Sequence, residues 1–273
     1  MAAFARGDYP QAYDLLQQTP DAATQNGKAM GAVLLALIER FDEADRMLEA
    51  ADVPAFQVIL RGERQRTTRW RDPEANGSLT ATDDVPLIPI YVAIATAFVR
   101  ENQTLADQAK AKLTELAQPL AGKLTFIDGE VLAFTDITDG DDSIGQMLET
   151  YCGEGLLYFP FATLQRIEVL PRVHFLDHLM PRVRITDAHG TSQAYVPLLY
   201  ACSATSPITQ VRTGEATLTM NLGTARRGHG QRGLIIDGAK LAGFHRVAAI
   251  DFDPHAQTPT TRSTQPLGQA PTE

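Results

Sequence analysis

The sequence predicts an α+β fold: an all-α, degenerate TPR-like helical-repeat domain over residues 1–121, then a mostly antiparallel β-rich domain over residues 122–253. At 273 residues the chain is long enough for two such domains, each with its own core. Apolar residues recur at helical spacing in the first part, but in short runs or at every second position in the second part. Only 5 of the 20 glycines lie before residue 122, whereas 14 lie in 122–253, where they favour turns between strands.

A repeated pattern supports the helical part. An aromatic residue, an alanine three positions later and a leucine four beyond it share one helical face, which lets a neighbouring helix approach closely. The pattern occurs twice, 32 residues apart, close to the period of about 34 residues in helical-repeat solenoids. Its two copies are Tyr9, Ala12, Leu16 and Phe41, Ala44, Leu48. A further helix opens at Pro54 and carries Phe56, and we expect five or six helices before Pro119.

Short apolar runs separated by turn residues follow residue 123 and predict the strands of a sheet that curls or closes. The runs are 131–134, 156–161, 167–170, 183–185, 194–200, 216–220 and 234–236. One amphipathic helix is expected to interrupt them, with Ser143 as its N-cap and Gly153 at its end. Its apolar face would include Met147 and Tyr151.

Composition limits the classes of function. Lys plus Arg number 24 against 33 Asp plus Glu, a net charge of −9, so nucleic acid is not an expected partner. The longest uncharged apolar run, 85–99, is shorter than the roughly 20 residues that cross a bilayer, and no secretory pattern opens the chain. We therefore expect no membrane contact and a cytoplasmic location. Cys152 and Cys202 lack metal or redox spacing and are expected to be buried thiols, and residues 254–273 are expected to form a flexible tail.

Three motifs in the sequence have features of ligand-binding sites. Residues 228–233, Gly-His-Gly-Gln-Arg-Gly, fit a dinucleotide fingerprint, but β-like residues follow where a helix is needed, so a turn is predicted. His174 and His178 have metal-ligand spacing without a third ligand nearby, and surface histidines are the favoured interpretation. An acidic cluster lacks the ligand spacing of a calcium loop and is expected to be a solvated loop. It comprises Asp136, Asp139, Asp141 and Asp142.

Five arginines and a tryptophan lie within eleven residues of one predicted helix. They are Arg61, Arg64, Arg66, Arg69, Trp70 and Arg71. One interpretation is a basic and aromatic face for an acidic partner. The favoured one is a solvated helix side on which the arginine stems cover apolar surface.

A series of segments in the second half resembles a known family. The segments, in order, are 126–130, 136–149, 156–161, 167–168, 195–200 and 230–232. In this order and spacing they are similar to the ImpE/SciE/TagJ family, accessory proteins of the bacterial type VI secretion system. The resemblance extends over most of residues 1–252.

The resemblance implies a cytoplasmic adaptor without known catalysis, cofactor or metal. In this family the adaptor binds the N-terminal helix of the small subunit of the contractile sheath, and thereby modulates sheath handling by the disassembling ATPase. A helical-repeat groove is a suitable site for such a helix, and the sheet surface is the other candidate. The groove's candidate contact residues are Tyr9, Phe41, Phe56, Arg64, Arg69 and Trp70.

An alternative function belongs to a different class. The protein would be an enzyme, or a binder of a small molecule or metal, with a pocket in the β-rich domain. Its residues would be His174, His178, His229 and Arg232. Convergence of these four side chains in one concave site would favour this alternative.

Overall fold

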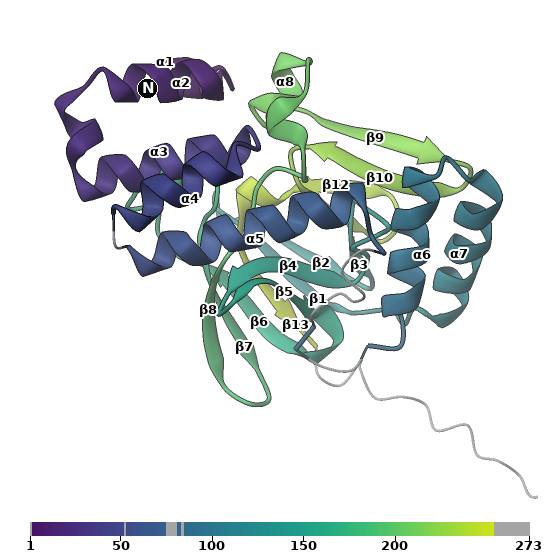
Figure 1. The fold of residues 1–273 in the computed structure, drawn as a ribbon. Helices are drawn as coiled ribbons and strands as arrows, with labels where there is room; N and C mark the ends of the chain where they lie inside the picture. The colour runs from purple at the N-terminus through teal and green to yellow at the C-terminus, as the bar shows by residue number, and fades with distance from the viewer. Residues whose placement is uncertain (1, 52, 75–80, 83–84, 254–273) are drawn as a thin grey trace, which may run out of the picture.

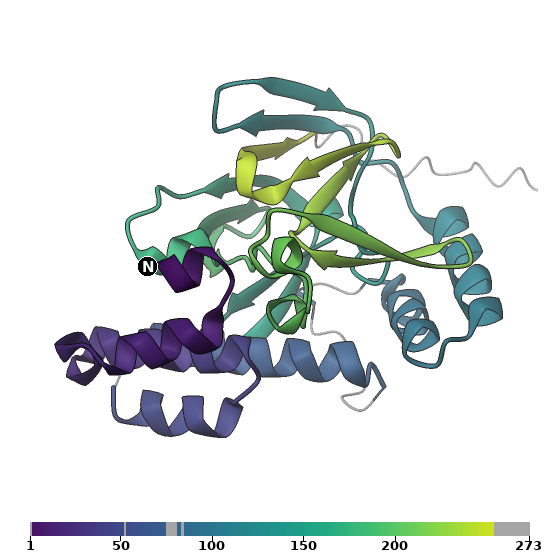
Figure 2. The same cartoon turned by 90° about the horizontal axis from the view of Figure 1, so that it is seen from above.

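The computed structural model describes residues 2–51, 53–74, 81–82 and 85–253. Helices come first and strands second, which confirms the predicted α+β class (Figures 1 and 2). The described residues before Pro119 form seven α-helices rather than five or six, because the four-residue α1 has too few residues to show a period. The helices are α1 (Ala2–Ala5), α2 (Tyr9–Gln17), α3 (Gln25–Leu37), α4 (Phe41–Glu49), α5 (Pro54–Arg71), α6 (Ile88–Val99) and α7 (Gln103–Leu116).

The two copies of the sequence repeat form equivalent helices. α2 begins at Tyr9 and α4 at Phe41, and each has nine residues. Asp8 caps α2 by accepting a hydrogen bond from the amide of Gln11 at 3.1 Å. α3 packs against α2, α4 and α5, which explains why nine of its residues are buried. α5 opens at Pro54 as predicted, since proline fits the first turn of a helix.

Thirteen strands and the short α8 (Thr209–Arg212) follow the helices within the described residues. Eight strands form one antiparallel sheet in the order β2-β1-β13-β6-β7-β8-β4-β5, three form a second in the order β12-β11-β3, and β10 pairs with β9. The strands are β1 (Gly122–Phe126), β2 (Val131–Phe134), β3 (Ile137–Asp139), β4 (Met147–Cys152), β5 (Gly155–Pro160), β6 (Leu164–Val169), β7 (Arg182–Asp187), β8 (Thr191–Tyr195), β9 (Thr217–Leu222), β10 (Ala225–Gly230), β11 (Gly233–Ile236), β12 (Lys240–Gly243) and β13 (Val247–Phe252).

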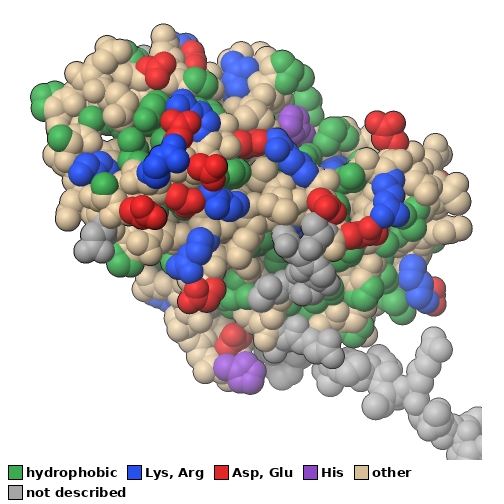
Figure 3. Space-filling model, viewed as in Figure 1, with side chains coloured by type: hydrophobic (Ala, Val, Ile, Leu, Met, Phe, Trp, Pro, Cys, Tyr) green, Lys and Arg blue, Asp and Glu red, His purple; other side chains and the backbone are tan. Residues whose placement is uncertain are grey.

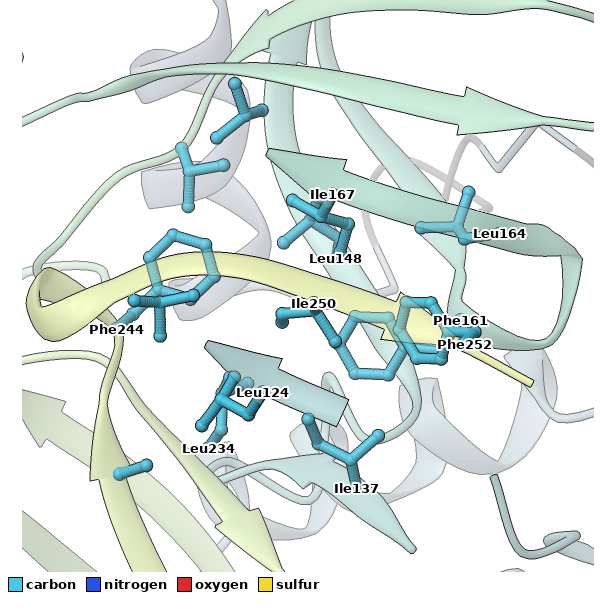
Figure 4. Close-up of a cluster of buried hydrophobic side chains, with 14 of the residues drawn as sticks. Leu124, Ile137, Leu148, Phe161, Leu164, Ile167, Leu234, Phe244, Ile250 and Phe252 are labelled. Atoms are coloured by element: carbon cyan, nitrogen blue, oxygen red, sulfur yellow. The ribbon is translucent and has the colours of Figure 1, made fainter. Parts of the chain in front are cut away.

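The main hydrophobic core lies inside the β-rich half. It is built from strands of the eight-stranded and three-stranded sheets, with Leu124, Ile250 and Leu234 near its centre (Figure 4). Phe161 and Phe252 stack with ring centroids 5.5 Å apart. Two further clusters combine helix residues with strand residues, so helices and strands are held together by shared apolar packing.

The helix expected from Ser143 to Gly153 is wrong. The chain turns at residues 142–144, continues through Gly145 with φ +61°, and then enters strand β4. Five of the six β4 residues are buried, because α5 covers one face and the sheet core covers the other. A strand that is buried on both faces carries large side chains on each of them. Met147 and Tyr151 are four residues apart, which is also the spacing of neighbours on one face of a helix.

The turn predicted at 228–233 is also corrected. Gly228 to Gly230 belong to strand β10 and Gly233 begins β11, so only residues 231 and 232 link two strands. A Cβ at Gly228 would lie 2.4 Å from the ring of Tyr200, so this glycine permits close packing. The strand expected at 194–200 ends at Tyr195 as β8.

Two other expectations concern the chain as a whole. Residues 254–273, expected to be a tail, lie outside the described residues. Within the described part of the chain, no helix has both the length and the apolar character needed to cross a bilayer.

Candidate functional site

Helix α5 lies directly on strands β4 and β5, and this contact organises the candidate site (Figure 1). The absence of a side chain at Gly62 makes the approach possible, because a Cβ there would lie 2.3 Å from Cδ1 of Tyr151. Gln65 accepts a hydrogen bond from the amide of Leu156 at 2.7 Å, which ties the helix to β5. Glu63 and Arg66 of α5 are therefore held in a buried interface.

A chain of alternating charges begins at this interface. Arg66 is 3% exposed and donates to Glu63 at 2.9 Å and to the Tyr151 hydroxyl at 2.8 Å. Its Nε lies 3.1 Å from a carboxylate oxygen of Glu149 on β4. The Tyr158 hydroxyl donates to Glu149 at 2.7 Å. Burial raises the pKa of Glu149, but Arg66 and other cations outweigh it and hold the pKa below its usual range.

The chain of charges continues into the β-rich half through Arg232. This residue is 1% exposed, and its Nε donates to Asp139 at 2.8 Å while Nη1 lies 3.3 Å from Glu149. The Tyr200 hydroxyl also donates to Asp139, at 2.8 Å. Glu63, Arg66, Glu149, Arg232 and Asp139 thus alternate in sign from α5 to β3, and we call these five residues the buried charge chain.

Asp139 gives the buried charge chain a pH dependence. Burial raises the pKa of this carboxyl from its ordinary 3.8 to about 6, although Arg232 acts in the opposite direction. The folded state therefore binds this proton more tightly than the unfolded state. The resulting stability is fully present below about pH 3.8 and is lost as the pH rises through about 6.

The variant Asp139→Asn tests this dependence. Between about pH 4.5 and pH 7.5 the wild type should lose about 2 kcal/mol of unfolding free energy relative to the variant, because only the wild type titrates at this position. Urea unfolding at a series of pH values measures the difference. Parallel pH profiles for the two proteins would contradict the assignment.

A second buried cluster surrounds Asp141. Its carboxylate accepts hydrogen bonds from the Ser143 hydroxyl at 2.6 Å and from the amide of Gly228 at 3.2 Å. Arg227 lies nearby with its Cζ 3.4 Å from the ring centroid of Trp70 and donates to the Trp70 carbonyl at 2.8 Å. Burial lowers the pKa of Arg227 to about 10, so it remains charged at neutral pH.

The solvated acidic loop expected here is therefore wrong, since Asp139, Asp141 and Asp142 are at most 2% exposed.

Asp139 and Asp142 can be buried because they form ion pairs with arginine and lysine side chains that are distant in the sequence. Arg226 and Lys110 both contact Asp142, at 3.2 and 2.8 Å. The spacing of residues along the sequence indicates neither these ion pairs nor the burial of the aspartates. One signal was present: Glu149 interrupts an otherwise apolar run, and a charge inside a buried strand requires a partner.

The structure separates the six residues predicted to bind a partner. Tyr9 is 1% exposed, and its hydroxyl donates to the Arg212 carbonyl at 2.7 Å. Phe56 packs between two core clusters. Arg69 turns toward the β-rich half, where it donates to the Ser143 carbonyl at 2.7 Å and to the Tyr158 hydroxyl.

The other three lie in two places. Phe41 and Arg64 are adjacent, with the Arg64 Cζ 5.3 Å from the ring centroid. Arg64 also pairs with Asp45 at 2.6 Å on a surface of mixed charge over α4 and α5 (Figure 3). Trp70 stacks on His229 near the end of α5, with centroids 6.4 Å apart. The predicted single groove is thus divided between the core, one mixed-charge surface and the α5–β10 contact.

The four residues of the alternative pocket have different surroundings. Arg232 is enclosed in the buried charge chain, and His229 contacts Trp70 and Ser203. His174 caps the short 3-10 turn η3 (Phe175–His178) that also holds His178. No interaction joins a histidine to Arg232 among the described residues, and within them no three His, Cys, Asp or Glu side chains are placed to hold a metal.

The surroundings of the two cysteines favour the protonated thiol over the nucleophilic thiolate. Both are free and partly buried. Burial raises the pKa of Cys202 to about 12, and it also raises the pKa of Cys152. A thiolate is therefore disfavoured at either position.

A surface cavity of about 250 Å³ opens where α7 meets the β-rich half. Leu113 and Ala117 of the α7 side and Ile235 of β11 contribute apolar surface to it. Lys110 and Arg226 line it as well, with side chains 24% and 32% exposed, and both are held by Asp142. The cavity therefore combines an apolar surface with fixed charges of both signs.

These features define an α+β protein whose helices are joined to an antiparallel β-rich half by buried ion pairs. Residues 132–251 match the family described as ImpE protein, so the resemblance predicted from the sequence is confirmed over this part of the chain. No curated protein sequence matches it. The crystal structure of protein VPA1032 from Vibrio parahaemolyticus is similar, with a TM-score of 0.75 and 16% identity over 92% of this chain and 96% of that chain. At this identity the similarity concerns the fold.

Proposed function

We propose that this chain is a non-catalytic adaptor of the bacterial type VI secretion system. It binds the N-terminal helix of the small sheath subunit and thereby modulates sheath handling by the disassembling ATPase. The ImpE family match supports the secretion context. The observation that carries the binding proposal is the cavity of about 250 Å³ beside α7.

The dimensions of the cavity suit side chains of a helix. Small-molecule sites usually enclose about 300–1,000 Å³, so this cavity is below that range. An amphipathic helix docks by inserting apolar anchors spaced three or four residues apart, while its polar side chains remain at the rim. Leu113 and Ile235 offer the apolar contact, and Lys110 and Arg226 offer donors to acidic residues of the helix.

Calorimetric titration with a synthetic peptide of the sheath-subunit helix tests the proposal, beside a scrambled peptide. Thr114 is exposed on α7 and lines the cavity, so Thr114→Trp should fill it and weaken binding by about tenfold or more. Glu115→Trp is the matched control, because its neighbouring position is exposed and does not line the cavity. We expect the control to bind like the wild type.

Two outcomes would contradict parts of the proposal. An absence of saturable binding to the native peptide would reject the adaptor function. Binding that is unchanged in Thr114→Trp but lost in Arg64→Glu would move the site to the mixed-charge surface over α4 and α5. Circular dichroism of each variant distinguishes lost contact from lost folding.

A further inference from the structure

Strand β9 has one bonded edge and one open edge. It pairs with β10 through a two-residue turn at Gly223 and Thr224, which makes Leu222 and Ala225 the closing pair. In an antiparallel hairpin the residues alternate between bonding across the pair and directing their amide and carbonyl groups outward. The outward-directed residues of β9 are therefore Thr217, Thr219 and Asn221.

The corresponding outward amides of β10 are all occupied. The Arg226 amide donates to Asp142 at 2.8 Å, and its carbonyl accepts from the Asp142 amide at 2.9 Å. The amides of Gly228 and Gly230 donate to Asp141 and Ser203. By contrast, the described residues include no hydrogen-bond partner for the outward backbone groups of Thr219 and Asn221. Figure 1 shows β9 along the upper margin of the molecule.

The composition of β9 matches an edge that receives another strand. Residues 217–222 contain no charge and no proline, the devices that usually protect an exposed edge. The edge strand β12, for comparison, carries Lys240. Leu218 and Met220 share one face of β9 and are 39% and 41% exposed.

We propose that β9 is a homodimerisation edge that pairs antiparallel with β9 of a second copy of this chain. With the two-fold axis at Thr219, the residues Thr217, Thr219 and Asn221 face Asn221, Thr219 and Thr217 of the partner copy. These three pairs form about six backbone hydrogen bonds. Leu218 then lies opposite Met220 of the partner copy, in the closely spaced type of pair.

The pattern of β9 suits a second copy as its partner. Read from Thr219 in either direction, the strand alternates apolar and polar residues in the same order, so it complements itself. Because it carries no charge, two copies bring no like charges together within the paired segment. The four-stranded sheet β10-β9-β9-β10 has two-fold symmetry, as in most dimers.

The interface is small, so the dimer should be weak. Stable interfaces bury about 800 Å² per partner, more than one strand of this length provides. We expect weak dimerisation that increases with protein concentration, and sedimentation equilibrium of the full chain at up to about 0.5 mM should detect the dimer. This dimer does not depend on the proposed sheath partner.

Charge placed at the axis tests the register. Thr219 faces itself, so Thr219→Asp and Thr219→Lys should each weaken self-association by about tenfold, whereas a mixture of the two should form a heterodimer. Asn221→Asp adds the same charge but faces Thr217, and it should lose less than about threefold. Thr219→Pro removes the outward amide of this residue and breaks no hydrogen bond within the chain. It should also dissociate the dimer.

Either of two results would overturn the proposal. One is a wild type that stays monomeric at about 0.5 mM, where a dimer of this size should be populated. The other is a dimer whose affinity is the same in Thr219→Asp, Thr219→Lys and their mixture, which would place the interface elsewhere. Thermal unfolding of each variant verifies that the hairpin substitutions leave the fold intact.

Discussion

Arg232→Met should lower the free energy of unfolding by about 3–5 kcal/mol. Arg232 is among the largest fully buried side chains, and its guanidinium contacts Asp139 and Glu149. Methionine replaces the aliphatic stem of the arginine but carries no charge, so both carboxylates would remain buried without this partner. Equilibrium urea unfolding measures the loss.

Two further variants separate the charge effect from packing. Arg184→Met removes an arginine whose pairing with Glu168 is largely exposed, and it should cost at most about 1 kcal/mol. The double variant Arg232→Met with Asp139→Asn should recover part of the loss, because one stranded charge is removed with its partner. A cost for Arg232→Met no greater than that for Arg184→Met would contradict the role of the buried charge chain.

Arg66→Met should also cost about 3–5 kcal/mol, and it should act on the helical part of the molecule in particular. Arg66 connects α5 with Glu149 and with the Leu199 carbonyl. Its loss leaves Glu63 buried without its cation and leaves Glu149 with the ion pair to Arg232 alone. Hydrogen exchange should show α5 amides opening more readily than amides of β13. Urea unfolding measures the total change.

The matched control lies two positions earlier on the same helix. Arg64 pairs with Asp45, and both side chains are 42% exposed, so Arg64→Met should change stability by at most about 1 kcal/mol. Equal effects of the two substitutions, or uniform opening of helices and strands in Arg66→Met, would contradict a specific attachment of α5 by the buried charge chain.

The sequence predicted those elements whose signals are local. Tyr9 and Phe41 start equivalent helices because a repeated aromatic, alanine and leucine pattern requires the same packing in each copy. Pro54 starts α5, and the apolar run at 131–134 coincides with β2. Both signals act through the adjacent backbone, because proline fits the first turn of a helix and a short apolar run between turn residues favours a strand. The sequence resemblance to the ImpE family likewise depended on segments in order.

The predictions that failed depended on contacts between distant residues. Met147 and Tyr151 have helical spacing, yet they lie in β4, because α5 and the sheet core bury opposite faces of this strand. The local sequence around Asp141 predicts a solvated loop, but the fold surrounds this residue with hydrogen-bond donors from Ser143 and Gly228.

The sequence by itself determined the α+β order of the chain and the ImpE resemblance of its β-rich half, because these follow from periodicity, glycine content and the order of short segments. Only the tertiary structure decided which charges are buried. Arg66, Glu149 and Arg232 lie far apart in the chain and are neighbours only after α5 docks on β4. The energy of a buried charge depends on the partners that surround it in space, and no local spacing encodes those partners.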